Sequence, residues 1–256
     1  MLSYSKCSYR IGGGPWGWCD LPSEWNVRGA VKHKILVLGN SYAANQGRVV
    51  YEMCRNPETE IKIFAMAGCE VFSTTREFWH CHNSSKVYME AIKEYKPDVL
   101  FILVRYIHAL EIPSPTNELM IGRMAKEGAE VLRSFSRYVS SNIFVQHAIP
   151  RPVLGFEWQC QQAVLREQIV DSATVVNKSV NVGLARELLE RSIQNCSKCT
   201  MIDYSPVFTI NETFQFFDND ARILNFNGYF HFTPFGLHKL RPYYKNICSN
   251  ITYPGK

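Results

Sequence analysis

The stretch KILVLGNSYAANQG, residues 34–47, runs from a short apolar segment into Gly39-Asn40-Ser41 and then into small and polar residues that can open a helix. A strand that turns sharply into a helix exposes a side chain above the sheet and presents backbone N–H groups beside it. This geometry suits a serine nucleophile and suits the binding of an anion equally well. Ser41 is also a good N-cap for the helix, so its position alone leaves these alternatives open.

Short apolar runs alternate with helical patterns along the rest of the chain. This alternation is typical of a parallel sheet covered by helices. The pattern predicts five strands, which are Lys34 to Leu38, Ile61 to Ala65, Val99 to Val104, Asn142 to Gln146 and Thr200 to Asp203. Apolar residues between the third and fourth strands trace one helical face, from Ile121 to Tyr138, which we expect to lie on the sheet.

The remaining segments suggest one main domain, residues 31–250, preceded by an N-terminal extension, residues 1–30, that packs on it. Residues 157–194 have a mostly helical pattern, broken near Asn177 to Gly183, and predict two helices. The stretch from Phe208 to Tyr229 has no clear period, so we expect an irregular loop that leads to a last helix from Thr233 to Asn250.

Composition excludes some function classes and indicates a compartment. The formal charge of +5 over 256 residues is spread without a run of Lys or Arg, which argues against binding of nucleic acid. No apolar run reaches the length of a membrane span, and we find no signal peptide. Nine cysteines favour an oxidising compartment, as do glycosylation sequons at Asn83, Asn177, Asn195, Asn211 and Asn250. We therefore expect a chain cut from a longer membrane-associated precursor, on its extracytoplasmic or luminal face.

The odd number of cysteines leaves at least one thiol unpaired. Cys196 and Cys199 have the spacing of a zinc or redox pair, but no second pair follows, so we interpret them as structural disulfide partners, with Cys248 as a further candidate. In His80-Cys81-His82, alternate neighbours point in different directions, which disfavours a metal site. We expect no metal and no cofactor.

Ligands of an open parallel sheet bind beyond the carboxyl ends of its strands. The residues expected there include Ser41, Gly68, Arg105 and His231. A serine at one strand end, a histidine near another and a glycine N–H between them form the outline of an acyl-transfer site. The alternative for His231 is a partly buried histidine in an aromatic loop.

These residues resemble the SGNH, or GDSL-like, hydrolase family: Gly39-Asn40-Ser41, then Gly68, then His231 followed by Thr233 and Gly236. The chain is most similar to the SGNH domains fused behind acyltransferase-3 membrane domains, in a nematode-like version. That similarity rests on PDVLFILVRYIHAL (97–110), IFVQHAIPRP (143–152) and HFTPFGLHKLRPYYKNIC (231–248). It covers the chain from about Val31 to Cys248.

The resemblance implies a three-layer α/β/α flavodoxin-like sandwich around the five-stranded parallel sheet. It implies that Ser41 is the nucleophile and His231 the base, with the N–H groups of Ser41 and Gly68 as oxyanion hole. The reaction would be O-acyl transfer, with acetyl the expected group, or ester hydrolysis. The partners would be an acyl donor, a hydroxyl-bearing, glycan-like acceptor and an acyltransferase-3 membrane domain.

Two positions depart from the family pattern. Gly228 stands where the family has an aspartate three residues before the histidine, and Arg105 stands where ordinary members have an asparagine. A carboxylate that holds the imidazole contributes about 10⁴ in rate in a serine protease, so its loss matters. Asp218 or Asp220 are candidates to replace it, and Asn227 could orient the ring without charge. The alternatives to an enzyme are a catalytically impaired module that binds glycan or protein, and a flavodoxin-like nucleotide binder.

Overall fold

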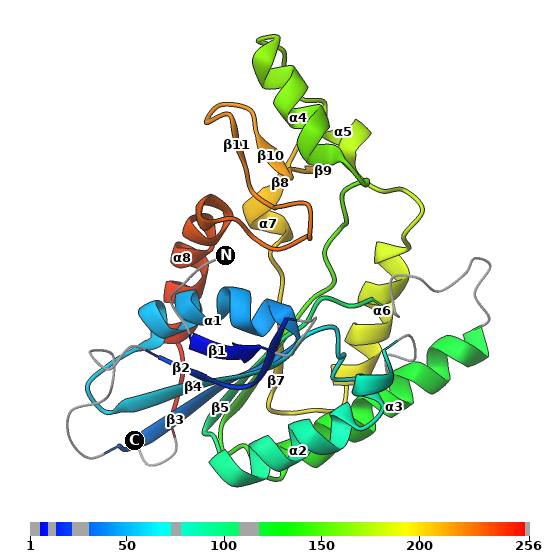
Figure 1. Ribbon diagram of the computed structural model, residues 1–256. Helices are drawn as coiled ribbons and strands as arrows, with labels where there is room; N and C mark the ends of the chain where they lie inside the picture. The colour runs from blue at the N-terminus through cyan, green and yellow to red at the C-terminus, as the bar shows by residue number, and fades with distance from the viewer. Residues whose placement is uncertain (1–5, 10–13, 22–30, 73–77, 108–117, 254–256) are drawn as a thin grey trace.

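A computed structural model describes residues 6–9, 14–21, 31–72, 78–107 and 118–253 (Figure 1). Its centre is a seven-stranded sheet in the order β1-β2-β4-β3-β5-β6-β7. The five strands β4, β3, β5, β6 and β7 are parallel to one another. Their bounds are β3 His33–Gly39, β4 Thr59–Met66, β5 Val99–Leu103, β6 Asn142–Gln146 and β7 Cys199–Ile202. The predicted parallel sheet is therefore confirmed, strand by strand.

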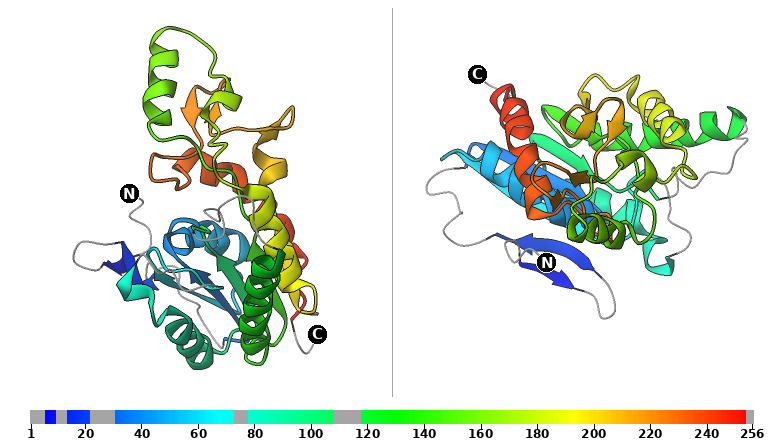
Figure 2. Two further views of the ribbon diagram at one scale, coloured as in Figure 1. Left: turned by 90° about the vertical axis from the view of Figure 1, so that its right-hand side faces the viewer. Right: turned by 90° about the horizontal axis from the view of Figure 1, so that it is seen from above.

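The sheet has two more strands than the sequence predicts. β1 (Lys6–Tyr9) and β2 (Pro15–Asp20) are antiparallel to each other, and β2 pairs antiparallel with β4. A disulfide joins Cys7 to Cys19 across the pair. The described part of the N-terminal extension thus continues the sheet at its β4 edge (Figure 2). β2 pairs with the edge of β4 that the parallel strands leave unpaired. The sequence of residues 15–20 has no alternating pattern that would predict this strand.

Helices cover both faces of the sheet. α1 (Ser41–Cys54) and α8 (Pro234–Ser249) lie on one face, whereas α2 (Ser84–Tyr95), α3 (Glu118–Ser136) and α6 (Val182–Ile193) lie on the other. Alternate residues of β3 enter the two cores, with Ile35 and Val37 facing α1, and Leu36 and Leu38 facing α2. Burial on both faces explains why the strand is a continuous apolar run. No helix among the described residues has the length and apolar character needed to cross a membrane.

A smaller unit projects beyond the carboxyl ends of the strands (Figures 1 and 2). It contains three helices, α4 (Phe156–Leu165), α5 (Ser172–Val175) and α7 (Ser205–Phe208). Two short antiparallel pairs complete it, β8 (Thr209–Ile210) with β9 (Thr213–Phe214) and β10 (Phe217–Asp218) with β11 (Ile223–Leu224). A short 3₁₀ helix, η2 (Trp79–Cys81), lies elsewhere, between β4 and α2.

The expectations for this region were only partly right. Residues 157–194 form three helices, α4, α5 and α6, instead of two. The expected irregular loop, Phe208 to Tyr229, contains β8 to β11. Four of its aromatic side chains form a packed cluster with Phe232 from the following segment; the four are Phe208, Phe214, Phe216 and Phe226. A strand of two residues is too short to show an alternation of apolar and polar residues in the sequence. Packing of the phenylalanine cluster stabilises these short strands instead.

Gly39 ends β3 at a point where backbone from a neighbouring strand comes very close. A Cβ atom on residue 39 would overlap the carbonyl oxygen of Leu103 and would lie 2.8 Å from its carbon. The φ angle of Gly39 is +155°, a value that L side chains rarely adopt. Glycine therefore allows β3 and β5 to remain paired up to the start of α1.

We predict that Gly39→Ala lowers the free energy of unfolding by roughly 2–4 kcal/mol, because the added methyl group has no room and the backbone is strained. Urea denaturation followed by circular dichroism measures this. Gly122→Ala is the matched control: its Cβ would meet nothing within 4 Å, and it lies inside α3. That variant should gain up to about 1 kcal/mol. Equal effects at the two positions would contradict the packing argument.

Candidate active site

Ser41 is the first residue of α1. It is not the N-cap of this helix, which was one of the two alternatives that the sequence allowed. The N-cap is Asn40, whose Oδ1 accepts a hydrogen bond from the N–H of Tyr42 at 3.2 Å. The Ser41 hydroxyl instead lies 2.8 Å from Nε2 of His231. Two residues separated by 190 positions in the chain thus meet at the carboxyl end of β3.

The loop that carries His231 is held against α1 on both sides of the imidazole. The Asn45 side chain donates to the carbonyl of Phe232 and accepts from its N–H, both at 3.1 Å. The Tyr42 hydroxyl donates to the carbonyl of Phe230 at 2.6 Å. Thr233 then caps α8 by accepting from the N–H of Gly236 at 3.1 Å. The position of the imidazole therefore depends on the same helix that presents Ser41.

Asn227 stabilises the turn before His231. Its Oδ1 accepts hydrogen bonds from the N–H groups of Tyr229 at 3.1 Å and His231 at 3.0 Å. Its contact is thus with the backbone of His231, whereas the sequence suggested contact with the ring. Asparagine side chains commonly accept hydrogen bonds from backbone N–H groups a few residues later in tight turns.

Arg105 links the end of β5 to both parts of the site. Its N–H donates to Asn40 Oδ1 at 3.0 Å, and the Asn40 amide donates back to the Arg105 carbonyl at 2.9 Å. Its guanidinium donates to the carbonyl of Tyr229 at 3.1 Å and lies 5.4 Å from the centre of the Phe230 ring. A positive charge therefore lies beside the loop that carries the imidazole.

Gly68 follows β4, at the neighbouring strand end, with a φ angle of +76°. The hydroxyl of Tyr88 lies 3.0 Å from the carbonyl oxygens of both Gly39 and Cys69. This shared contact ties the turn that contains Gly68 to the end of β3, directly before Asn40 and Ser41. The position is suitable for a backbone donor in an oxyanion hole, a role that remains a proposal.

Burial keeps the imidazole of His231 neutral. Desolvation, with a smaller contribution from the positive charge of Arg105, lowers the pKa of His231 from 6.5 to about 4. A neutral imidazole can accept the Ser41 proton at Nε2, which requires that Nδ1 carry the ring hydrogen. Burial also raises the pKa of Tyr42 to about 12, against the lowering effect of Arg105 and Arg151. Tyr42 is therefore a hydrogen-bond donor at neutral pH and not a base.

The two acidic candidates from the sequence have other surroundings. Asp218 pairs with Lys239 at 2.5 Å and accepts from the N–H of Ala221 at 2.8 Å. Partial burial acts to raise the pKa of Asp218, but these two partners lower it below its usual value. Asp220 is exposed. In the part of the chain that the structure describes, no carboxylate lies within hydrogen-bonding distance of the His231 ring.

Four disulfides join eight of the cysteines, which are Cys7–Cys19, Cys54–Cys248, Cys69–Cys81 and Cys196–Cys199. Cys160 is buried and unpaired. Cys54–Cys248 connects the last residue of α1 to α8, so the helix that begins at Ser41 is linked to the helix that follows His231. Cys69, His80 and Cys81 are close enough for a metal ion, but both sulfurs are in a disulfide and are not thiolate ligands.

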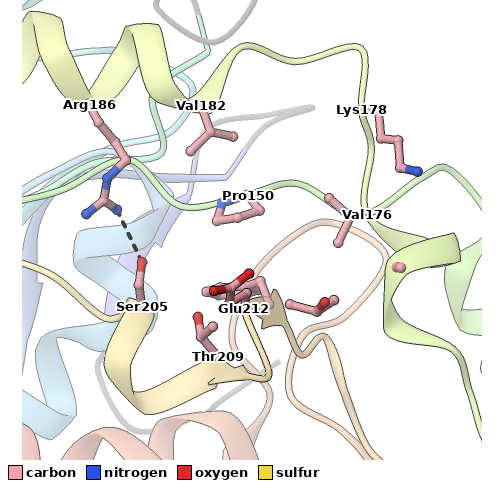
Figure 3. A pocket seen from close by; sticks show the side chains of 11 residues that line it. Pro150, Val176, Lys178, Val182, Arg186, Ser205, Thr209 and Glu212 are labelled. Carbon is pink, nitrogen blue, oxygen red and sulfur yellow. Dashed lines mark hydrogen bonds between the residues drawn. The ribbon is translucent and has the colours of Figure 1, made fainter.

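Two cavities border the projecting unit, one against α6 and the other against the start of α8. The cavity in Figure 3, of about 530 Å³, is lined by Arg186, Ser205 and Glu212 among others. The Arg186 guanidinium is already engaged by Asp203 and Ser205. The second cavity, of about 570 Å³, is lined mostly by apolar atoms and includes Glu157 and Thr233. It therefore adjoins the segment directly after His231.

The sequon asparagines are distributed over the surface. Asn83, Asn195, Asn211 and Asn250 are exposed, and Asn177 is half-buried, with its Oδ1 accepting from the N–H and hydroxyl of Ser179. Four of the five are therefore accessible in the folded chain, as a glycan acceptor must be.

Comparison with protein families identifies the group. The model of the SGNH domain fused to AT3 domains matches residues 6–246. The chain belongs to this family. The SGNH domain described here has no significant match among curated protein sequences.

Solved structures share its fold. The periplasmic domain of a lipopolysaccharide acetyltransferase from Salmonella ser. Paratyphi A superposes with a TM-score of 0.62 at 12% identity, covering 87% of this chain and 85% of that one. A protein described as a GDSL-like lipase, from Parabacteroides merdae, gives a TM-score of 0.51 at 10% identity, covering 88% and 99%. These similarities show the SGNH α/β/α fold.

Three side chains that organise the site had no assigned role in the sequence interpretation: the amides of Asn40 and Asn45 and the hydroxyl of Tyr42. A signal was present for Asn45, because residues four apart share a helix face and Ser41 is four positions before it. The partners of these side chains are backbone atoms of Arg105, Phe230 and Phe232. Every residue has the same backbone atoms, so a sequence does not show which of them will be partners.

We predict that His231 titrates in the folded SGNH domain near pH 4, because burial and Arg105 both disfavour its charged form. Arg105→Gln removes the positive charge, so the pKa of His231 should rise towards 6.5. NMR of the imidazole Cε1–H against pH measures both values. Arg222→Gln, which removes an exposed arginine, is the control and should leave the pKa of His231 unchanged. A midpoint of 6.5 or higher in the unaltered domain would contradict the prediction.

Proposed function

We propose that this SGNH domain transfers an acyl group, with acetyl as the expected group, from an ester donor to a hydroxyl-bearing, glycan-like acceptor or to water. The observation that carries the proposal is the 2.8 Å contact between the Ser41 hydroxyl and Nε2 of His231 at the carboxyl edge of the sheet. Membership of the SGNH family and the fold shared with an acetyltransferase domain and a GDSL-like lipase support acyl transfer or hydrolysis in general.

In the first half-reaction, Ser41 Oγ attacks the carbonyl carbon of the donor ester while His231 Nε2 takes the hydroxyl proton. The negative charge of the tetrahedral intermediate develops near the start of α1, where the N–H groups of Ser41 and Gly68 and the helix dipole can stabilise it. When the intermediate collapses, the ester C–O bond breaks and the imidazolium gives its proton to the leaving alcohol. An acyl-Ser41 enzyme remains.

In the second half-reaction, the acceptor hydroxyl gives its proton to His231 and attacks the acyl-Ser41 carbonyl. The bond to Ser41 Oγ breaks, and the imidazolium returns the proton to Ser41. Transfer and hydrolysis differ only in whether a sugar hydroxyl or water attacks, so the shape of the pocket decides the product. The mechanism needs no metal and no cofactor.

We further propose that the domain acts on the extracytoplasmic or luminal side of a membrane, with an acyltransferase-3 membrane domain as partner. The family description names that fusion, and the acetyltransferase domain with the same fold is periplasmic. Four disulfides and accessible sequons also fit an oxidising compartment. In this arrangement a membrane partner delivers the acyl group and Ser41 passes it on.

The second candidate is a module that keeps the fold and binds glycan or protein without catalysis. Gly228 favours it, because the aspartate that supports the imidazole elsewhere in the family is missing. The contact between Ser41 and His231 favours the enzyme, because a binding module has no need of it.

Reaction with a fluorophosphonate probe tests the proposal. We expect the purified domain to be labelled at Ser41, Ser41→Ala to show no labelling, and His231→Ala to react roughly 10²–10⁴-fold more slowly, as loss of a general base predicts. Labelling is measured by in-gel fluorescence and the site by peptide mass spectrometry. Circular dichroism confirms that each variant is folded. Failure of the folded, unaltered domain to react would support the binding module instead.

A further inference from the structure

The space beside Gly228 is occupied by a carboxylate from another part of the chain. Glu157, in the first turn of α4, accepts a hydrogen bond from the N–H of Gly228 through Oε1. A Cβ atom on residue 228 would lie 2.8 Å from Cδ of Glu157 and closer still to Oε2. The Glu157 carboxylate thus lies where the side chain of an aspartate at position 228 would be.

Glycine at position 228 leaves room for this carboxylate. Gly228 is not among the residues with positive φ, so its backbone conformation is open to any amino acid. A side chain at position 228 would displace the flexible end of Glu157 from the place that it now occupies. The Glu157 carboxylate and a side chain at position 228 therefore compete for the same space.

α4 is anchored so that Glu157 faces this turn. Phe156, one residue earlier, is buried and packs against Phe216 with ring centres 5.9 Å apart. Cys160, one helical turn later, is also buried. Glu157 itself is at the surface, and its side chain is one methylene longer than that of aspartate. The carboxylate is therefore not fixed by packing at its contact with the Gly228 N–H.

We propose that Glu157 is the positioning residue that replaces the family aspartate and faces Nδ1–H of His231 during the reaction. This inference rests on the proposed function. When His231 takes the Ser41 proton, the imidazolium lies close to the positive charge of Arg105 in a partly desolvated site. A carboxylate beside it stabilises that charged form and keeps the hydrogen on Nδ1, so that Nε2 faces Ser41.

A swap of the carboxylate between the two positions tests the proposal, with the rate of fluorophosphonate labelling of Ser41 as the readout. We expect Glu157→Ala and Glu157→Gln to react at least about 10-fold more slowly than the unaltered domain, within the range known for loss of such a carboxylate. In the double variant Glu157→Ala with Gly228→Asp, the aspartate has room, and the rate should recover by at least about 10-fold over Glu157→Ala. Glu94→Gln, which removes an exposed carboxylate on α2, is the control and should react at the unaltered rate.

The pH dependence gives a second readout. Removal of a negative charge near the imidazole lowers the pKa of His231, so the acid limb of the labelling rate should move to lower pH in Glu157→Gln, opposite to the shift expected for Arg105→Gln. A glutamate in a first helical turn can also simply stabilise its helix. In that case Glu157→Gln lowers the melting temperature, the pH profile does not move and Gly228→Asp rescues nothing, a result that overturns the proposal.

The outcomes separate this inference from the proposed function. If the unaltered domain is labelled at Ser41 and Glu157→Gln reacts equally fast, Ser41 and His231 work as a dyad and the role of Glu157 is refuted while the enzyme stands. If the folded, unaltered domain is not labelled at all, the proposed function fails, and the role of Glu157 fails with it.

Discussion

The backbone of β3 and β5 comes so close at Gly39 that no side chain fits between them, and the location of the site depends on this approach. Because β3 stays paired with both β4 and β5 up to Gly39, the chain must turn at the rim of the sheet and enter α1 at once. Asn40 closes that turn by capping the helix and by a reciprocal pair of hydrogen bonds with Arg105. Ser41 is left at the rim with its hydroxyl available to a partner from outside the sheet.

That partner comes from the other end of the chain, and the contact requires many interactions to position it. The loop with His231, between β11 and α8, has only a single antiparallel bridge of its own, from Phe226 to Phe232. It is positioned by side chains of α1, since an amide such as Asn45 can both donate to and accept from the same backbone residue. The disulfide between Cys54 and Cys248 links the distal parts of the two helices. Closing a loop of this length restricts the unfolded chain strongly.

Electrostatics around the imidazole follow from burial and from two substitutions in the family pattern. A buried histidine is less basic than a solvated one, and Arg105 at the asparagine position lowers its pKa further. In the proposed mechanism, a negative charge beside His231 would stabilise its protonated form. Gly228 carries none, but the turn that contains it is in contact with the carboxylate of Glu157. Under our proposal, the charges around the imidazole come from Arg105 after β5 and from Glu157 on α4, and not from the turn before His231 itself.

The sequence by itself determined the parallel sheet, because β3 and β5 at its centre contain continuous apolar runs that are buried on both faces and can be recognised locally. It also placed Ser41, Gly68, Arg105 and His231 near the same edge, because the carboxyl ends of parallel strands share that edge. Only the tertiary structure decided the pairing of β2 with β4, the short strands around the phenylalanine cluster and the contact between Glu157 and Gly228. Each of these contacts depends on a partner that is distant in the sequence. The local pattern of apolar and polar residues does not identify that partner.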